Sequence, residues 1–155
     1  MTSAIRIFVD ADACPVKEEI YRVAYRVNVP VTLVSNAYLR IPQHPLIARV
    51  VVSDGFDAAD DWIAEHSDRH AIVVTADILL ADRCLKAGAD VIAPNGTPFT
   101  GNSIGNAVAI RAIMNDLRAG AVGDRIGGPP PFAKEDRSRF LSALDAALTR
   151  KLRLG

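Results

Sequence analysis

Two predicted strands of this chain end in acidic residues. Residues 5–9 are apolar except for Arg6 and rich in β-branched side chains, and Asp10 follows them directly. A second run of this kind, residues 71–75, ends at Thr75 and is followed closely by Asp77. Ligands of parallel sheets gather at the carboxyl ends of the strands, so both carboxylates are expected at the functional edge.

Further aspartates lie near this edge in the predicted fold. Asp12 follows Asp10 by two residues, and Asp57, Asp60 and Asp61 open a predicted helix, in which Asp57 and Asp61 share a face. Clustered carboxylates repel one another unless a cation lies among them. Oxygen ligands with few histidines favour Mg²⁺ or Mn²⁺ over zinc. We therefore predict a divalent-metal site, with Asp10, Asp57, Asp61 and Asp77 as catalytic residues and Asp12 as a further ligand.

Each of these acids also has a structural explanation when it is taken singly. Asp57 and Asp77 stand where the N-cap of a helix is expected, and aspartate is a favoured cap. Asp12 could cap a helix led by Pro15. The metal site is predicted from the set as a whole, because two separate strands end in acids.

Two residues near the first acids have open roles. Lys17 is expected to reach the carboxylates or bind a phosphate, or else to be an ordinary exposed lysine. Cys14 precedes Pro15 at a predicted helix start, where a thiolate is stabilised; the alternative is a small buried residue.

The spacing of apolar residues predicts alternating strands and helices in a single domain, residues 1–155. Half of the 155 residues are hydrophobic and 23% are charged, as in a folded globular chain. Strands are expected over 5–9, 31–35, 49–52, 71–75 and 90–93, and helices over 15–27, 57–66 and 78–87. This pattern is typical of an α/β fold with three layers: a mostly parallel sheet of about five strands, in the order 3-2-1-4-5, with helices on both faces.

The remaining segments connect or extend this core. Residues 36–47 and 95–103 are predicted loops, and residues 104–117 are a predicted helix. The run at 127–131, Gly-Gly-Pro-Pro-Pro, is interpreted as a bent connector, and a last helix carries Phe140, Leu141, Leu144 and Leu148.

Composition excludes several classes of protein. No apolar run approaches the length of a membrane span, and the N-terminus does not resemble a signal peptide, so a cytoplasmic location is expected. Two cysteines are too few for a disulfide scaffold, and neither a dinucleotide fingerprint nor a P-loop is present. The net charge is zero, yet residues 111–155 carry 9 basic and 5 acidic side chains. An excess of acidic residues before residue 111 and of basic residues after it is compatible with a cation site beside a surface for anionic ligands. It is equally compatible with solvated charge that is unevenly distributed.

The motifs resemble those of a known family. Residues 9–17, V-D-A-D-A-C-P-V-K, are similar to the opening signature of the YaiI/YqxD family of uncharacterised bacterial proteins. The similarity continues through residues 57–63, 74–81, 94–96, 127–129 and 136–140, and so covers nearly the whole chain.

A looser resemblance is to PIN-like and NYN-type ribonuclease domains, which gather acids around Mg²⁺ or Mn²⁺ to cut RNA. It implies that Asp10 is the first acid, Asp57 or Asp61 the helix acid and Asp77 the strand-four acid, with Thr75 supplying a hydroxyl. RNA is then the expected partner. Lys17, Arg111 and Arg137 are candidates for phosphate contacts, although both arginines suit helix surfaces or structural ion pairs equally well.

Two other functions are compatible with the same residues. Asp10 and Asp12 also match the Asp-x-Asp opening of haloacid-dehalogenase-like phosphatases, in which the first aspartate is the nucleophile. That family usually inserts a flap before its first helix, whereas a helix is predicted here directly after Cys14. The non-enzymatic alternative is an RNA- or partner-binding module whose acids bind a structural ion or none.

Overall fold

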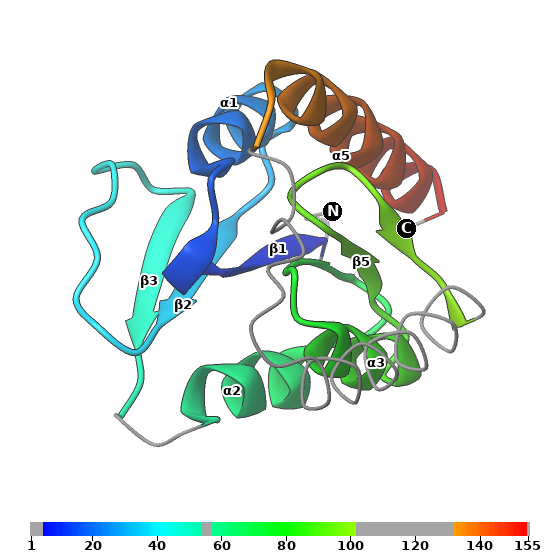
Figure 1. Ribbon diagram of the computed structural model, residues 1–155. Helices are drawn as coiled ribbons and strands as arrows, with labels where there is room; N and C mark the ends of the chain where they lie inside the picture. The colour runs from blue at the N-terminus through cyan, green and yellow to red at the C-terminus, as the bar shows by residue number, and fades with distance from the viewer. Residues whose placement is uncertain (1–4, 54–56, 102–131, 155) are drawn as a thin grey trace, which may run out of the picture.

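A single sheet of six strands forms the centre of the molecule. The computed structural model describes residues 5–53, 57–101 and 132–154 (Figure 1). The strands are β1 (Arg6–Asp10), β2 (Val31–Ser35), β3 (Ile47–Val51), β4 (Ala71–Val74), β5 (Asp90–Ile92) and β6 (Pro98–Phe99). They lie in the order β3-β2-β1-β4-β5-β6. Every pairing is parallel except that of β5 with β6.

Helices cover both faces of the sheet. Helices α1 (Lys17–Val27) and α5 (Lys134–Leu154) lie on one face, and α2 (Ala58–His66) and α3 (Ile78–Lys86) lie on the other (Figure 1). Alternate residues of the central strand serve the two layers. Ile7 and Val9 of β1 pack in the core with α1 and α5, whereas Phe8 packs with α2 and α3. The prediction of a three-layer α/β fold is therefore confirmed.

The main difference from the predicted fold is the sixth strand. Residues 95–103 are predicted as a loop, but residues 98–99 return along β5 as an antiparallel edge strand. Two residues are too few to show an alternation of apolar and polar side chains, so the pattern gives no signal for this strand. The predicted helix over 104–117 and the connector at 127–131 lie outside the described residues. In the described part of the chain, no helix is both long and apolar enough to cross a membrane.

Helix α5 is held to the sheet by apolar and polar contacts. Phe140, Leu144 and Leu148 are fully buried in the apolar core that they share with α1 and this face of the sheet. The Lys151 ammonium donates a hydrogen bond of 2.6 Å to the carbonyl of Arg69. At the other end of α5, the Arg137 guanidinium donates to the Pro15 carbonyl at 2.8 Å and pairs with Glu19. The start of α5 is thereby fixed beside the segment that joins β1 to α1.

The turn between β5 and β6 also constrains α5. Gly96 has a φ of +92°, and its amide donates to the carbonyl of Ala93 at 2.9 Å. A Cβ atom on Gly96 would lie 2.5 Å from the carbonyl carbon of Arg139 and 2.7 Å from the amide nitrogen of Phe140. Only glycine lets this turn pack directly against the backbone of α5.

We predict that Gly96→Ala destabilises the fold much more than Gly88→Ala does. Both glycines have positive φ, but a Cβ on Gly88 would come no closer than 3.4 Å to Arg69. Gly88→Ala should therefore cost only the backbone strain, about 1–2 kcal/mol. Gly96→Ala should cost roughly 1–3 kcal/mol more, because the helix must move away. Urea denaturation of the two variants measures the difference, and equal losses of stability would contradict this role of the turn.

Candidate active site at the carboxyl edge of the sheet

The site is organised by a hydrogen-bonded link between β1 and the end of β4. These strands are parallel neighbours with Val9 opposite Val74, so Asp10 and Thr75 leave the sheet side by side. The Thr75 hydroxyl donates to Oδ2 of Asp10 at 2.8 Å and accepts from the amide of Asp77 at 3.0 Å. Thr75 is only 1% exposed. The two predicted strand-end acids are therefore joined through one buried hydroxyl, and Thr75 positions Asp10 from below the surface.

Asp77 is also the N-cap of α3. Its Oδ1 accepts hydrogen bonds from the amides of Leu79 at 2.9 Å and Leu80 at 3.2 Å. The capping role considered from the sequence therefore applies to this residue. This capping role uses only one oxygen of the Asp77 carboxylate, Oδ1. In the part of the chain that the structure describes, Oδ2 of Asp77 and Oδ1 of Asp10 accept no hydrogen bond. Each carboxylate is thus fixed by one oxygen and has the other available for a ligand.

The aspartates of α2 face in different directions. Asp61 forms an ion pair with Arg83 of α3 at 2.9 Å, which directs it toward that helix. Asp60 lies within electrostatic range of Asp10, Asp57 and Asp77, and burial together with these charges raises its pKa to about 6. Asp57 precedes α2 but makes no capping hydrogen bond with its side chain. The charge of Asp60 is therefore coupled to those of the acidic edge, whereas helical spacing alone favours Asp57 with Asp61.

The segment between β1 and α1 is short. It contains a single turn of 3₁₀ helix, Ala11–Ala13, and α1 begins at Lys17. Asp12 is exposed, and its Oδ2 accepts a hydrogen bond of 3.4 Å from the backbone N–H of Asn36. Cys14 is buried, and burial raises the pKa of its thiol. The structure thus favours the second explanation of Cys14, a small buried residue, over a reactive thiolate.

Negative charge accumulates around Asp10. Burial is the largest influence and raises its pKa; the Thr75 hydrogen bond lowers it, and the charges of Asp12 and Asp77 raise it again. In the described ranges, no lysine or arginine forms an ion pair with Asp10, Asp60 or Asp77. The edge is therefore electrostatically suited to bind a cation.

The predicted basic residues have different surroundings. Arg137 is engaged by Glu19 and the Pro15 carbonyl, which is the structural ion pair considered from the sequence. Lys17 is the first residue of α1 and is partly exposed, with no ion pair to a described acid. Arg111 lies outside the described residues.

The donor set has the chemistry of a site for a hard cation, but it is not a closed metal cage. Mg²⁺ and Mn²⁺ take carboxylate oxygens as ligands, and Asp10, Asp60 and Asp77 supply such oxygens without an ion pair to a described lysine or arginine; the Arg83 charge only lowers the pKa of Asp60. As the residues stand, no three side chains of His, Cys, Asp or Glu in the described segments are close enough to enclose one ion. An ion held here would be bound by few protein ligands and would keep several waters, which is usual for Mg²⁺.

Comparison with known proteins identifies the family. Residues 8–150 match the family model described as "Uncharacterized BCR, YaiI/YqxD family". The chain belongs to the YaiI/YqxD family. It is 72% identical over 148 residues to a UPF0178 protein of Sphingopyxis alaskensis, with 96% of each chain covered. It is 60% identical over 148 residues to a UPF0178 protein of Nitrobacter winogradskyi, covering 96% of this chain and 93% of that relative.

These relatives confirm the family predicted from the V-D-A-D-A-C-P-V-K string, and their names state no activity. No solved structure matches the chain. The acidic edge is therefore the feature of this YaiI/YqxD family member that bears on its chemistry.

The raised pKa of Asp60 predicts a pH-dependent cost to stability. Its value of about 6 in the folded protein lies above the ordinary 3.8, so the folded state binds more protons between these two values. Stability should therefore fall as the pH rises through this range. Asp60→Asn removes the charge and should stabilise the fold by about 1 kcal/mol near neutral pH, since solvent screens part of the effect.

Urea denaturation in the presence of a chelator, repeated from about pH 7 down to about pH 4, measures this dependence. The gain in stability from Asp60→Asn should disappear at the acidic end of this range, because the Asp60 carboxyl of the wild type is protonated there and so is uncharged too. Asp61→Asn is the matched control, because it breaks the ion pair with Arg83 and should give no gain. A gain for Asp60→Asn that is independent of pH would contradict the electrostatic assignment.

Proposed function

We propose that this protein hydrolyses phosphodiester bonds of RNA at the acidic edge, with Mg²⁺ or Mn²⁺ as cofactor. The observation that carries the proposal is the hydrogen bond from Thr75 to Asp10. It fixes a carboxylate without a basic partner next to Asp77, at the sheet edge where α/β proteins bind ligands. The resemblance to PIN-like and NYN-type domains supports the choice of RNA.

Three aspartates would have separate roles around the proposed ion. Asp10 and Asp77 would hold the ion through Oδ1 and Oδ2, respectively, the oxygens that accept no hydrogen bond from the described residues. Asp60 would add negative charge from α2. A bound divalent ion supplies charge neutralisation at the phosphate and lowers the pKa of the attacking water. Hydrolysis forms a bond between the water oxygen and phosphorus and breaks the bond from phosphorus to one sugar oxygen, which takes up a proton.

The phosphatase alternative receives less support from the structure. A phosphoryl group on Asp10 would need its Oδ1 as nucleophile and Asp12 as the acid. The link from β1 to α1 consists of residues 11–16 and contains only one short helical turn, so a flap is not present there. We therefore favour direct attack by water over a phosphorylated aspartate.

Asp10→Asn should abolish metal-dependent cleavage of RNA. The substitution preserves the size of the side chain and an acceptor for Thr75 but removes the charge that would hold the ion, so the rate should fall by roughly 100-fold or more. The measurement is gel electrophoresis of a 5′-labelled single-stranded RNA incubated with Mn²⁺, Mg²⁺ or a chelator. Asp82→Asn is the matched control, since Asp82 lies on α3 in an ion pair with Lys86.

Three results would contradict the proposal. Cleavage that persists in Asp10→Asn would come from another source. Trapping of a phosphorylated Asp10 with a phosphomonoester substrate would favour the phosphatase. Binding of RNA that needs neither metal nor Asp10, without any cleavage, would favour the non-enzymatic module. Thermal unfolding of each variant shows that a loss of activity is not a loss of fold.

Thr75→Val tests whether the buried hydroxyl positions the site. Valine has nearly the shape of threonine but leaves Oδ2 of Asp10 and the amide of Asp77 without their shared partner. We expect a roughly 10- to 100-fold loss in kcat and a raised requirement for Mn²⁺. Thr75→Ser keeps the hydroxyl and should restore most of the activity. Equal activity of the valine and serine variants would show that the hydroxyl serves only the fold.

A further inference from the structure

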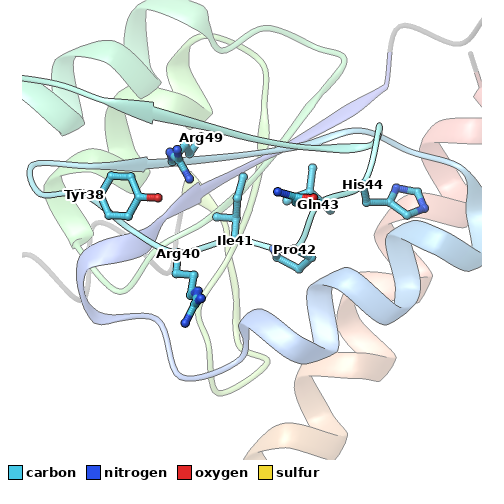
Figure 2. Close-up of a pocket in the computed structure, with 8 residues that line it drawn as sticks. Tyr38, Arg40, Ile41, Pro42, Gln43, His44 and Arg49 are labelled. Carbon is cyan, nitrogen blue, oxygen red and sulfur yellow. The ribbon is translucent and has the colours of Figure 1, made fainter.

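A basic hollow against the segment that follows β2 has no role in the site described above. After β2, residues 36–46 run along the side of the molecule and lead into β3, and the hollow of about 780 Å³ lies against this segment (Figure 2). We call it the Tyr38–Arg49 hollow. Its polar lining comes from Tyr38, Arg40, Gln43, His44 and Arg49, and none of the described residues that line it is acidic.

The aromatic ring in this hollow is unusually open to solvent. Tyr38 is 72% exposed, and the guanidinium of Arg49 lies 4.3 Å from the centre of its ring. Arg49 is held in place by a hydrogen bond of 3.2 Å from its Nη1 to the carbonyl of Leu39. Figure 2 shows both side chains at the same end of the hollow. An exposed ring next to an ordered guanidinium is a surface on which an unpaired base can stack.

The positive charge of the hollow is not neutralised by the protein. Arg40 and Arg49 are both exposed, and neither forms an ion pair with any acid in the described parts of the chain. By contrast, Arg26, Arg83 and Arg150 each pair with an aspartate within 3 Å. Two guanidinium groups without carboxylate partners are suited to binding phosphates, which accept bidentate hydrogen bonds.

The hollow adjoins a second one that reaches the start of α1. Arg40 also lines a second hollow of about 410 Å³, together with Lys17 and Glu18 at the start of α1. The segment itself starts at the edge, where the amide of Asn36 donates to Asp12. Arg40 and Lys17 therefore lie where the hollow meets the start of α1, along a segment that begins beside Asp12.

We propose that the Tyr38–Arg49 hollow binds a single-stranded nucleic acid, with phosphates on Arg40 and Arg49 and one unpaired base on Tyr38. The inference deepens the proposed function, on which it rests for the kind of polymer, because it places the part of the strand that flanks the bond to be cut. An acidic peptide would satisfy the two arginines but would leave the ring of Tyr38 without a partner. A duplex would keep its bases stacked on one another and unavailable to the ring.

The test measures binding without cleavage. Fluorescence anisotropy of a fluorescein-labelled oligouridylate is recorded in a chelating buffer over a range of salt concentrations. The double variant Arg40→Ala/Arg49→Ala should bind at least roughly tenfold more weakly, and its salt dependence should fall by about 0.7 per lost contact. Tyr38→Ala should also weaken binding roughly tenfold, whereas Tyr38→Phe keeps the ring and should bind like the wild type.

Controls separate this inference from the proposed function. Arg153→Ala removes an exposed arginine of α5 and should leave binding unchanged. Asp10→Asn should bind the oligonucleotide at least as tightly as the wild type, because chelated conditions need no metal. If it does so and no variant or condition shows cleavage, the hollow is supported and the proposed hydrolysis is not. An oligodeoxyuridylate tested in parallel distinguishes recognition of the backbone from recognition of ribose, and binding of either that the arginine and Tyr38 variants weaken supports the hollow.

Two outcomes would overturn the inference. Wild-type affinity in both the double arginine variant and Tyr38→Ala would show that the strand, if bound, lies elsewhere. Displacement of the oligonucleotide by polyglutamate at similar concentration, with no effect of Tyr38→Ala, would show a general anion surface and favour an acidic protein partner.

Discussion

The Thr75 hydroxyl is the point on which the geometry of the acidic edge depends. It donates to Asp10 and accepts from the amide of Asp77, so one buried group fixes acids that are far apart in sequence. The register of β1 with β4 makes this possible, because it places Val9 opposite Val74 and so brings the two strand ends together. Burial of the hydroxyl strengthens both hydrogen bonds and excludes water from them. The cost is a concentration of negative charge, visible in the raised pKa values of Asp10 and Asp60. This concentration of negative charge lowers the stability of the fold, and the cation that we propose for the edge would offset that cost.

Much of the fold could be predicted from the sequence because its signals are local. Apolar runs such as residues 5–9 and 71–75 indicate buried strands, and their alternation with amphipathic helices limits the topology to a few right-handed arrangements. The meeting of Asp10 with the end of β4 follows from the strand order. The family could also be predicted, since the V-D-A-D-A-C-P-V-K string is specific. Strand β6 could not, because two residues carry no periodicity and its pairing is fixed by the turn at Gly96 against α5.

The details of the site were harder to predict, because they depend on contacts between distant residues. Helical spacing relates Asp57 to Asp61, but the partner that directs Asp61 is Arg83 on another helix, 22 positions away. Asp60, which that spacing does not single out, is the residue whose pKa is raised by the charges of Asp10 and Asp77. In the same way, Arg137 is drawn to Glu19 and the Pro15 carbonyl by the docking of α5 on α1. Charge and spacing show that a residue is able to bind an ion or a phosphate; the tertiary contacts decide whether another residue has already engaged it.

The same reasoning distinguishes the basic residues around the edge. Several arginines of the described structure form ion pairs that join two elements of the fold. Examples are Arg150 with Asp90 and Arg26 with Asp145. Arg40 and Arg49 differ because the segment between β2 and β3 contains no acid. A connection between parallel strands normally contains a helix, whose packing would use its polar side chains or expose them evenly. Here an irregular segment takes that place, lies near α1 and leaves its own Tyr38 and Arg40, together with Arg49 of β3, exposed. The absence of a helix at this crossover is thus what provides a basic and aromatic surface next to the acids.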